Sequence, residues 1–568
     1  MASPRPTRVT VRSVPRAASF AAFLLVSSVG APSAHAQTQQ KPSSQTRKPS
    51  SSPAQPQQPA ASPAQAAKPN VAPASRSAAY LVRDILQGVD GSEPADLTPL
   101  HDVVVFSAGN KRYGRELWRT DGTRAGTSLL ADIQADKASS DPELLTRSGE
   151  RVYFRADDGK HGAELWATDG KVVGTDIVKD IQPGPGSSRP EKLTDANGVL
   201  YFRADDGVHG IELWRSDGTD DGTRLVKDIR PGPSSSIAGE LTVAGGKVFM
   251  RASDGTSGIE LWITDGTEAG TRRVKDIRAG ERGSVPGQLT AVGNLVFFSA
   301  NDGVHGSELW KSDGTEKGTA MVADIRIGEE GSMPMFLTSV GSTLFFSARG
   351  GGRGVELWRS DGTVRGTVRV KDIVPGQESS TPTDLVKLGK QVFFRADHDE
   401  YGTELWKSDG TESGTQLVRD IMHGIASSNP TNFTLSGNLL LFCANGGKRG
   451  VGVWQTDGTP DGTRVLAAGF STSNADMPDN LTPLGARTLF TAGENDHGTE
   501  LWAIAACGDG IVDPPEECDA GARNGHGACC TADCTLDAGC SEPSAPEPKA
   551  PAAPSARGGA GTSASPRE

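Results

Sequence analysis

GSELWKSDGTEKGT (residues 306–319) contains one of the nine tryptophans of this 568-residue chain. The other eight lie at the same place in copies of the same phrase. Successive tryptophans are 48 residues apart throughout: Trp118, Trp166, Trp214, Trp262, Trp310, Trp358, Trp406, Trp454 and Trp502. A fixed period of this length is typical of a repeat protein in which each repeat is one supersecondary unit.

The copy at residues 287–325 predicts the structure of one repeat. QLTAV, LVFFSA, SELWKS and TAMVADI have the composition of short strands, and GN, NDGVHG and DGTEKG between them have that of tight turns. Each repeat is therefore expected to be a four-stranded antiparallel meander, with a Gly-Thr pair opening the fourth strand. A crossing segment rich in Pro, Gly and Ser, such as RPGPSSSIAG (230–239), joins it to the next repeat.

The strand patterns and the two ends of the repeat region predict a closed β-propeller. LVFF and ELW place large apolar side chains on both faces of each sheet, so neighbouring sheets are expected to cover both sides. AYLVRDI (79–85) matches only a fourth strand, whereas TELWAIA (499–505) is a third strand with no fourth after it. The first fragment can complete the last repeat, which removes exposed sheet edges. We predict an all-β propeller of about nine four-stranded blades over residues 79–505.

Features shared by the repeats are interpreted as parts of the frame. A Gly stands four residues before every Trp, where a positive φ is the simple explanation. The Trp is interpreted as a buried wedge between blades, with an exposed sugar-stacking role as the alternative. The Glu two residues before Trp and the Asp residues of V-x-D-I and DGT are interpreted as turn caps. One calcium ion per blade is the alternative, although the spacing of a calcium-wrapping loop is missing; no other cofactor is expected.

One turn position varies between repeats and is the predicted binding site. It directly precedes the shared Gly, so its residues are expected to form a ring on one rim of the propeller, here called the rim ring. Loops on a rigid scaffold commonly carry recognition residues. Solvent exposure without a role is the alternative. The rim ring comprises Tyr113, His161, His209, His305, Arg353, Tyr401, Arg449 and His497, with Ser257 at the same position of one repeat.

The N-terminal segment predicts export. Four arginines and no acidic residue precede the short apolar stretch FAAFLLVSSVGA (20–31), and a small-x-small motif follows it. Residues 1–36 are therefore expected to be a signal peptide cleaved between Ala36 and Gln37. The apolar stretch is shorter than the ~20 residues that a membrane span needs. Residues 37–78 and 541–568, rich in Pro, Ser and Ala, are expected to be disordered.

Six of the seven cysteines gather at residues 507–540. An even cluster in an exported chain predicts a disulfide-bonded module, assigned to residues 506–540, whose pairing stays open. Zinc is the competing use, but the missing C-x-x-C pairs disfavour it. The seventh, Cys443, lies in a predicted strand and is interpreted as inert core. The six cysteines of the predicted module are Cys507, Cys518, Cys529, Cys530, Cys534 and Cys540.

Two parts of the chain resemble known families. The repeat region, with its ELWKSDGT phrases at 308–315 and 404–411, resembles the ELWxxDGT repeat proteins of bacteria. That resemblance implies an exported or surface-associated protein and implies no particular activity. CGDG and EECD within residues 507–519 resemble the myxobacterial cysteine-rich disulfide repeat, and also the start of disintegrin-like modules.

Charge and motifs favour a binding role for the whole chain. The formal charge is −12, and no long basic run is present, which argues against nucleic acid. We expect a secreted or cell-surface monomer without catalytic residues, which binds an extracellular polysaccharide or protein through the rim ring. The alternatives are a propeller-scaffold lyase or hydrolase acting on extracellular glycans, and a purely structural envelope or matrix protein. The losses that distinguish one repeat, such as Gly452 and Ala468, give the enzyme hypothesis no nucleophile or acid–base group.

Overall fold

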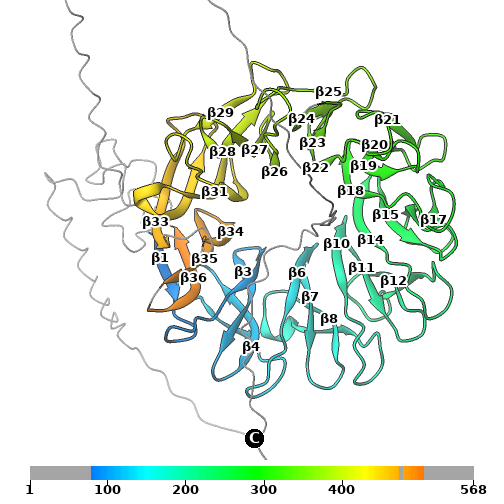
Figure 1. The fold of residues 1–568 in the computed structure, drawn as a ribbon. Coiled ribbons are helices and arrows are strands. Elements are labelled where there is room, and N and C mark those ends of the chain that lie inside the picture. The colour runs from blue at the N-terminus through cyan, green and yellow to red at the C-terminus, as the bar shows by residue number, and fades with distance from the viewer. Residues whose placement is uncertain (1–78, 353, 472–476, 495, 505–568) are drawn as a thin grey trace, which may run out of the picture. The chain divides into compact units, whose positions relative to one another are not determined.

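The computed structural model describes residues 79–352, 354–471, 477–494 and 496–504. Within these ranges the chain forms nine four-stranded antiparallel sheets, placed one after another around a ring (Figure 1). The predicted all-β propeller of nine blades is confirmed. The predicted signal peptide with its Ala36–Gln37 cleavage site, the 37–78 linker, the cysteine module, the C-terminal tail and Arg353 lie outside the described residues.

Each blade runs outward from an inner strand at the centre of the ring. The inner strands are β2 (Ala95–Leu100), β6 (Glu143–Ser148), β10 (Glu191–Ala196), β14 (Gly239–Ala244), β18 (Gly287–Val292), β22 (Met335–Val340), β26 (Thr383–Leu388), β30 (Thr431–Ser436) and β34 (Asp479–Leu484). The second strands are β3 (Val103–Asn110), β7 (Arg151–Asp157), β11 (Val199–Asp205), β15 (Lys247–Ser253), β19 (Leu295–Asn301), β23 (Thr343–Arg349), β27 (Gln391–His398), β31 (Leu439–Asn445) and β35 (Arg487–Glu494).

The third strands carry the tryptophans, and the outer strands are shorter. The third strands are β4 (Gly114–Thr120), β8 (Ala163–Thr168), β12 (Ile211–Ser216), β16 (Ile259–Thr264), β20 (Ser307–Ser312), β24 (Val355–Ser360), β28 (Gly402–Ser408), β32 (Val451–Thr456) and β36 (Gly498–Ile504). The outer strands are β5 (Ser128–Ala131), β9 (Asp176–Lys179), β13 (Arg224–Lys227), β17 (Arg272–Arg273), β21 (Ala320–Ala323), β25 (Val368–Arg369), β29 (Gln416–Arg419), β33 (Arg464–Ser471) and β1 (Ala79–Arg83). Two single-turn 3-10 helices, η1 (Val172–Gly174) and η2 (Gly447–Arg449), complete the described elements. Among the described residues, no helix has the length and apolar character needed to cross a membrane.

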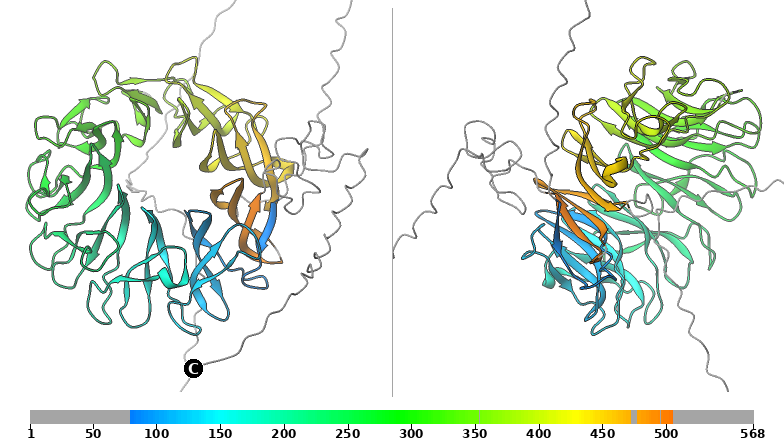
Figure 2. Two further views of the ribbon diagram at one scale, coloured as in Figure 1. Left: turned by 180° about the vertical axis from the view of Figure 1, so that it is seen from behind. Right: turned by 60° about the vertical axis from the view of Figure 1, so that its left-hand side comes forward.

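The ring is closed by its first strand. β1 pairs antiparallel with β36, and Tyr80 lies opposite Ala503. The ninth sheet therefore has the order β1-β36-β35-β34, with one strand from the start of the propeller and three from its end. Figure 2 shows β1 and the last strands side by side in both views. The sequence-based prediction that AYLVRDI completes the last blade is confirmed.

Apolar side chains from adjacent blades form the core. Around Trp310, one cluster combines Phe249 and Ile263 of the fourth blade with Val296 and Phe298 of the fifth. Eight of the tryptophans are buried and Trp358 is partly buried, so the wedge interpretation is confirmed. At the inner strands, threonine hydroxyls donate hydrogen bonds to the next blade, as Thr290 Oγ1 does to the Leu337 carbonyl oxygen at 3.2 Å.

A buried glutamate holds the crossing loop in every blade except the eighth, as the quoted repeat illustrates. Glu308 accepts hydrogen bonds from the backbone N–H groups of Arg326 at 3.0 Å and Ser332 at 2.8 Å, and from the Ser332 hydroxyl at 2.6 Å. The glutamate does accept hydrogen bonds from backbone N–H groups, as the turn-cap interpretation expected. These groups belong to the crossing loop that follows the blade, and not to the glutamate's own turn. We call the interaction the glutamate clasp. The residues are Glu116, Glu164, Glu212, Glu260, Glu308, Glu356, Glu404 and Glu500, all buried.

The shared glycine and the DGT turn have separate geometric causes. Gly306 has a φ of 70°, and a Cβ there would lie 2.5 Å from the Glu329 carbonyl oxygen in the crossing loop. Asp313 accepts hydrogen bonds from the backbone N–H and the hydroxyl of Thr315, which confirms its turn-capping role. One detail of the prediction differs. The Gly-Thr pair precedes the fourth strand, because the Thr319 N–H donates to the Glu316 carbonyl oxygen of the turn at 3.3 Å and not to the neighbouring strand.

Candidate functional site

Three of the four rim-ring histidines are held by an aspartate in their own turn. Nδ1 of His209 lies 2.7 Å from Asp206 Oδ2, and Nδ1 of His305 lies 2.7 Å from Asp302 Oδ2. These hydrogen bonds raise the pKa of His209 and of His305. His161 makes the same contact three residues back along the chain, at 2.9 Å. The Asp-x-x-His spacing in DDGVHG and NDGVHG was visible in the sequence, and it indicates a locally fixed turn.

Tyr401, Tyr113 and His497 of the rim ring also contact side chains of their own blades. Tyr401 stacks on His398 with ring centroids 4.8 Å apart, and the Arg112 guanidinium lies 4.9 Å from the centroid of the Tyr113 ring. His497 Nδ1 lies 3.1 Å from Asp84 Oδ2, next to the closing strand. Arg449 ends η2 and is exposed. The rim-ring residues thus lie one to a blade, and their role in binding stays a prediction.

The rim ring shares a face of the propeller with the crossing loops and the beginnings of the inner strands. In an antiparallel meander, the turn between the second and third strands lies on the side where the first strand begins. The contact between Gly306 and the Glu329 carbonyl oxygen confirms that this turn meets the crossing loop. We call this side the crossing face. The DGT turns lie on the opposite face.

A second variable ring lies on the crossing face, nearer the centre. The second residue of each inner strand has a left-handed backbone, with φ between 55° and 63°. A register shift that marks a β-bulge accompanies it in each inner strand, as between Gly287 and Thr290. Residues other than Gly rarely adopt this conformation. None of the nine residues at this position is Gly, and the type of side chain differs from blade to blade. The inner ring comprises Asp96, Leu144, Lys192, Glu240, Gln288, Phe336, Asp384, Asn432 and Asn480.

Some inner-ring side chains connect one blade to the next. Asp96 Oδ2 accepts a hydrogen bond from the Leu144 N–H at 2.6 Å, and Glu240 Oε2 accepts one from the Gln288 N–H at 3.2 Å. Gln288 Oε1 in turn accepts the Phe336 N–H at 2.9 Å. Each bond joins equivalent positions 48 residues apart. This function of the inner strand was not predicted, because it depends on which blades become neighbours.

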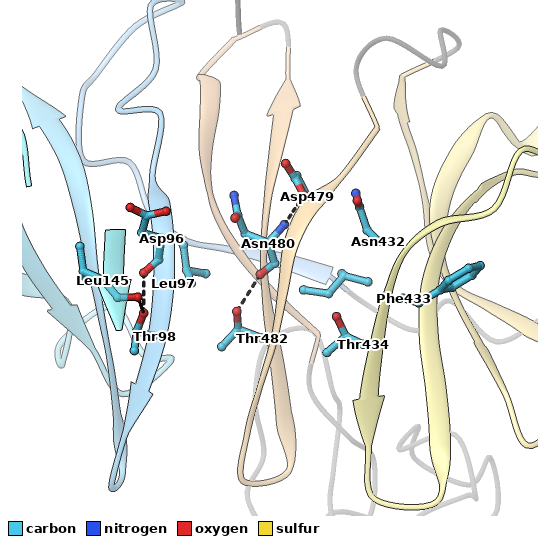
Figure 3. Close-up of a pocket in the computed structure, with 11 residues that line it drawn as sticks. Asp96, Leu97, Thr98, Leu145, Asn432, Phe433, Thr434, Asp479, Asn480 and Thr482 are labelled. Atoms are coloured by element: carbon cyan, nitrogen blue, oxygen red, sulfur yellow. Dashed lines mark hydrogen bonds between the residues drawn. The ribbon is translucent and has the colours of Figure 1, made fainter. Parts of the chain in front are cut away.

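The inner ring borders a hollow where the two ends of the propeller meet (Figure 3). It encloses about 320 Å³. Asp96, Asn432, Asp479 and Asn480 lie toward one end of it, and Thr98, Thr434 and Thr482 lie toward the other. The lining is completed by Leu97, Leu145, Phe433 and Leu481. We take this hollow and the surrounding crossing face as the candidate functional site.

Residues in the hollow come from segments distant in sequence. β2 belongs to the first blade, whereas β30 and β34 belong to the eighth and ninth. Ring closure brings them together, so a linear reading of one repeat does not reveal the hollow. A signal was nevertheless present, because the residue before the recurring Leu-Thr of the first strand changes in character from repeat to repeat.

Protein donors engage both oxygens of the clasp glutamates. In a V-x-D-I motif, Asp180 Oδ2 accepts the Gly184 N–H at 3.1 Å, whereas its buried Oδ1 has no hydrogen-bond partner among the described residues. Within the described part of the chain, no group of three or more His, Cys, Asp and Glu side chains is placed to hold a metal ion. Cys443 is buried, and its thiol donates to the Pro478 carbonyl oxygen at 2.9 Å. Burial raises the pKa of this thiol, so the inert-core interpretation fits the structure.

Comparison with known proteins yields no relative at the level of sequence. No protein-family model matches the chain, and no curated protein matches it. Among solved structures, the computationally designed Ika8 protein is 18% identical, with a TM-score of 0.38, covering 65% of this chain and 98% of its own. A puromycin hydrolase is 12% identical with a TM-score of 0.34, covering 63% of this chain and 59% of its own. The β-propeller domain of the Trilobed protease from Pyrococcus furiosus is 10% identical with a TM-score of 0.31, covering 60% of this chain and 99% of its own. Likenesses of this size carry no information on function.

Proposed function

We propose that this chain is an exported, non-catalytic binding protein that contacts an extracellular polysaccharide through its crossing face. The observation that carries the proposal is the distribution of variable residues over a repeated frame. Tryptophans, clasp glutamates, turn glycines and DGT aspartates recur because they hold blades together. The rim ring and the inner ring change from blade to blade, and both lie on the crossing face.

A variable face on a rigid frame suits recognition of an extended ligand. The sheets, the glutamate clasps and the closed ring fix the backbone, so little ordering of the protein is needed upon binding. Several blades can contact successive units of one polymer, which raises the overall affinity through multivalency. Carboxylate, amide, hydroxyl and imidazole groups on this face can hydrogen-bond sugar hydroxyls.

The resemblance to ELWxxDGT repeat proteins supports an extracellular location, as do the sequence features of residues 1–36. We therefore propose cleavage before Gln37 and function outside the cytoplasm. The cysteine module at 506–540 is proposed to be a disulfide-bonded extension of the propeller. A protein ligand on the same face is the second outcome that the test below distinguishes.

Binding to glycan arrays and to arrayed envelope extracts tests the proposal. Purified residues 37–568 should bind at least one polysaccharide saturably, with calcium and with a chelator in separate runs. Replacing Tyr113, Tyr401 and Arg449 together by Ala should weaken binding. The control is Lys317→Ala, an exposed residue of a DGT turn on the opposite face, which should leave binding unchanged.

Two results would contradict the proposal. Binding that is lost in the Lys317→Ala protein but kept in the triple variant would place the site on the wrong face. Absence of binding to every glycan and extract, by a protein shown to be folded, would favour a purely structural role.

A further inference from the structure

Several of the hydrogen-bond donors that line the hollow already have acceptors within the protein. The Asn432 amide donates to the Pro478 carbonyl oxygen at 2.9 Å, and the Asn480 amide donates to Thr491 Oγ1 at 3.1 Å. The Thr98 hydroxyl donates to the Asp96 carbonyl oxygen at 2.9 Å and lies 3.2 Å from the Leu145 carbonyl oxygen. The Thr482 hydroxyl donates to the Asn480 carbonyl oxygen at 2.8 Å. What these side chains can offer a ligand is therefore mainly oxygen acceptors.

The two carboxylates add negative charge to this acceptor-rich lining. Asp96 uses Oδ2 for the Leu144 N–H, and Asp479 uses Oδ1 for the Asn480 N–H at 2.7 Å, which leaves one oxygen of each outside these bonds. The described residues that line the hollow include no Lys, Arg or His. Burial raises the pKa of Asp96 above its ordinary value, and the hydrogen bonds from the backbone N–H groups of Leu144 and Leu145 oppose that rise. A ligand that fills the hollow should therefore carry donors and positive charge.

The volume of the hollow and its apolar side chains limit the kind of ligand that can fit there. A volume of about 320 Å³ is far larger than a metal ion needs and lies at the lower end of the range for small-molecule sites. Leu97, Leu145 and Leu481 supply an apolar surface beside the polar end. A sugar ring presents C–H groups that fit such a surface and hydroxyl groups that donate to acceptors. An acidic sugar would face repulsion from Asp96 and Asp479.

We infer that the hollow binds the ammonium-bearing ring of an unacetylated amino sugar within a polysaccharide, an inference that rests on the proposed polysaccharide-binding function. The ammonium group lies against the carboxylates of Asp96 and Asp479, and the ring hydroxyls donate to the carbonyl oxygens of Asn432 and Asn480. Because the lining comes from the first, second, eighth and ninth blades, the bound sugar bridges the junction that closes the ring.

Calorimetric titration with two matched oligosaccharides tests this inference. Residues 37–568 should bind a glucosamine tetramer at least tenfold more tightly than the N-acetylglucosamine tetramer, and the affinity should fall as salt is added. The Asp479→Asn substitution keeps an oxygen for the Asn480 N–H but removes the charge. It should weaken glucosamine binding roughly tenfold or more, as expected for loss of a charge-assisted hydrogen bond.

Glu316→Gln is the matched control. Glu316 is an exposed residue of a DGT turn on the opposite face, so its replacement removes one negative charge without touching the hollow. This substitution should leave binding unchanged. Thermal unfolding of each variant, without ligand, confirms that the proteins compared are folded.

Three outcomes would overturn the inference. The first is equal binding of the acetylated and unacetylated tetramers, and the second is unchanged glucosamine binding by the Asp479→Asn protein. The third is equally tight binding of spermidine, which would make the hollow a general amine site. If the array identifies another glycan whose binding is indifferent to Asp479, the inference fails while the proposed function stands. If no glycan binds, both fail.

Discussion

At the scale of the residue, the glutamate that stands two residues before a tryptophan shows most directly how one recurring side chain fixes the arrangement of a blade and its crossing loop. Its carboxylate reaches from the third strand to backbone N–H groups of the crossing loop, about 17 to 24 residues further along the chain. The Ser332 N–H is buried and the Ile325 N–H is partly buried, so loss of the glutamate would leave donors with reduced access to water without an acceptor. The hydrogen bonds of the clasp are a sufficient structural reason for this residue to recur.

The clasps predict an unusual dependence of stability on pH. Burial raises the pKa of Glu212 and of Glu404 to about 7, from an ordinary value of 4.5. A carboxyl group with a higher pKa in the folded state contributes stability below its unfolded pKa, and this contribution disappears as pH rises through about 7. The raised pKa values of His209 and His305 act in the same direction. We expect the urea midpoint of unfolding to be higher at pH 5 than at pH 8.

Glu212→Gln is the control for this effect. The variant should be less stable at both pH values, because an amide cannot accept every hydrogen bond that the carboxylate accepts. The difference in its midpoint between pH 5 and pH 8 should be smaller than in the parent protein. If the urea midpoint of the parent protein rises from pH 5 to pH 8, the buried clasps do not determine how its stability depends on pH between these values.

Backbone strain at the crossing face predicts a stabilising substitution. Val285 has a φ of 49° and is half exposed, although β-branched residues strongly avoid the left-handed region. Asn429 occupies the equivalent position of another blade with a φ of 47°. Val285→Asn should therefore raise the free energy of unfolding by about 1 kcal/mol.

Val208→Asn is the comparison for this measurement. Val208 is similarly exposed but does not have a left-handed backbone, so its replacement should change the free energy of unfolding by less than about 0.5 kcal/mol. Equal effects from the two substitutions would mean that hydration, and not strain, determines the result. Chemical denaturation of both variants provides the values.

At the scale of the element, the eighth blade departs from the common plan. Gly452 replaces the clasp glutamate, and β33 extends to Ser471, so that Gly452 lies opposite Ala468 in the ladder. The outer strand thus occupies space that the clasp uses in other blades. A Cβ at Gly452 would lie 2.2 Å from the Ala467 carbonyl oxygen, which explains why the position is glycine.

This close approach predicts that Gly452→Ala is destabilising. The added methyl group requires the outer strand to move, which should lower the free energy of unfolding by about 1–3 kcal/mol. Gly287→Ala is the control, because Gly287 has no atom within 4 Å of the added Cβ and no left-handed φ. Thermal melting that shows equal effects at Gly287 and Gly452 would contradict the packing described for the eighth blade.

The strands and turns of a blade were predictable from sequence because their causes are local. Short apolar runs such as LVFF, Gly at the strained turn and Asp in DGT all act within a few residues. The left-handed inner-ring position was not predictable, since its strain is supported by hydrogen bonds from neighbouring blades. The Asp-x-x-His turns were partly predictable from the sequence. Their spacing is local and visible, but only the structure shows that the aspartate holds the imidazole.

At the scale of the whole molecule, closure determines both the fold and the site. The 48-residue period and the unmatched strand at residues 79–85 made nine blades and their closure predictable. The hollow was not predictable, because it requires β2 and β34 to lie next to one another across the junction. The proposed sugar site therefore exists only if the ring closes as described.

Cross-linking of β1 to β36 tests closure most directly. Tyr80 and Ala503 lie opposite each other across the two strands, within the distance that a disulfide can span. Oxidation of the Tyr80→Cys, Ala503→Cys protein, followed by peptide mapping, should reveal a disulfide between the two introduced positions. The control pairs Tyr80→Cys with Ala167→Cys, a buried residue at the equivalent place in the second blade, and should form no such bond. Failure to link positions 80 and 503, or equal linking in the control, would contradict the closed nine-bladed ring.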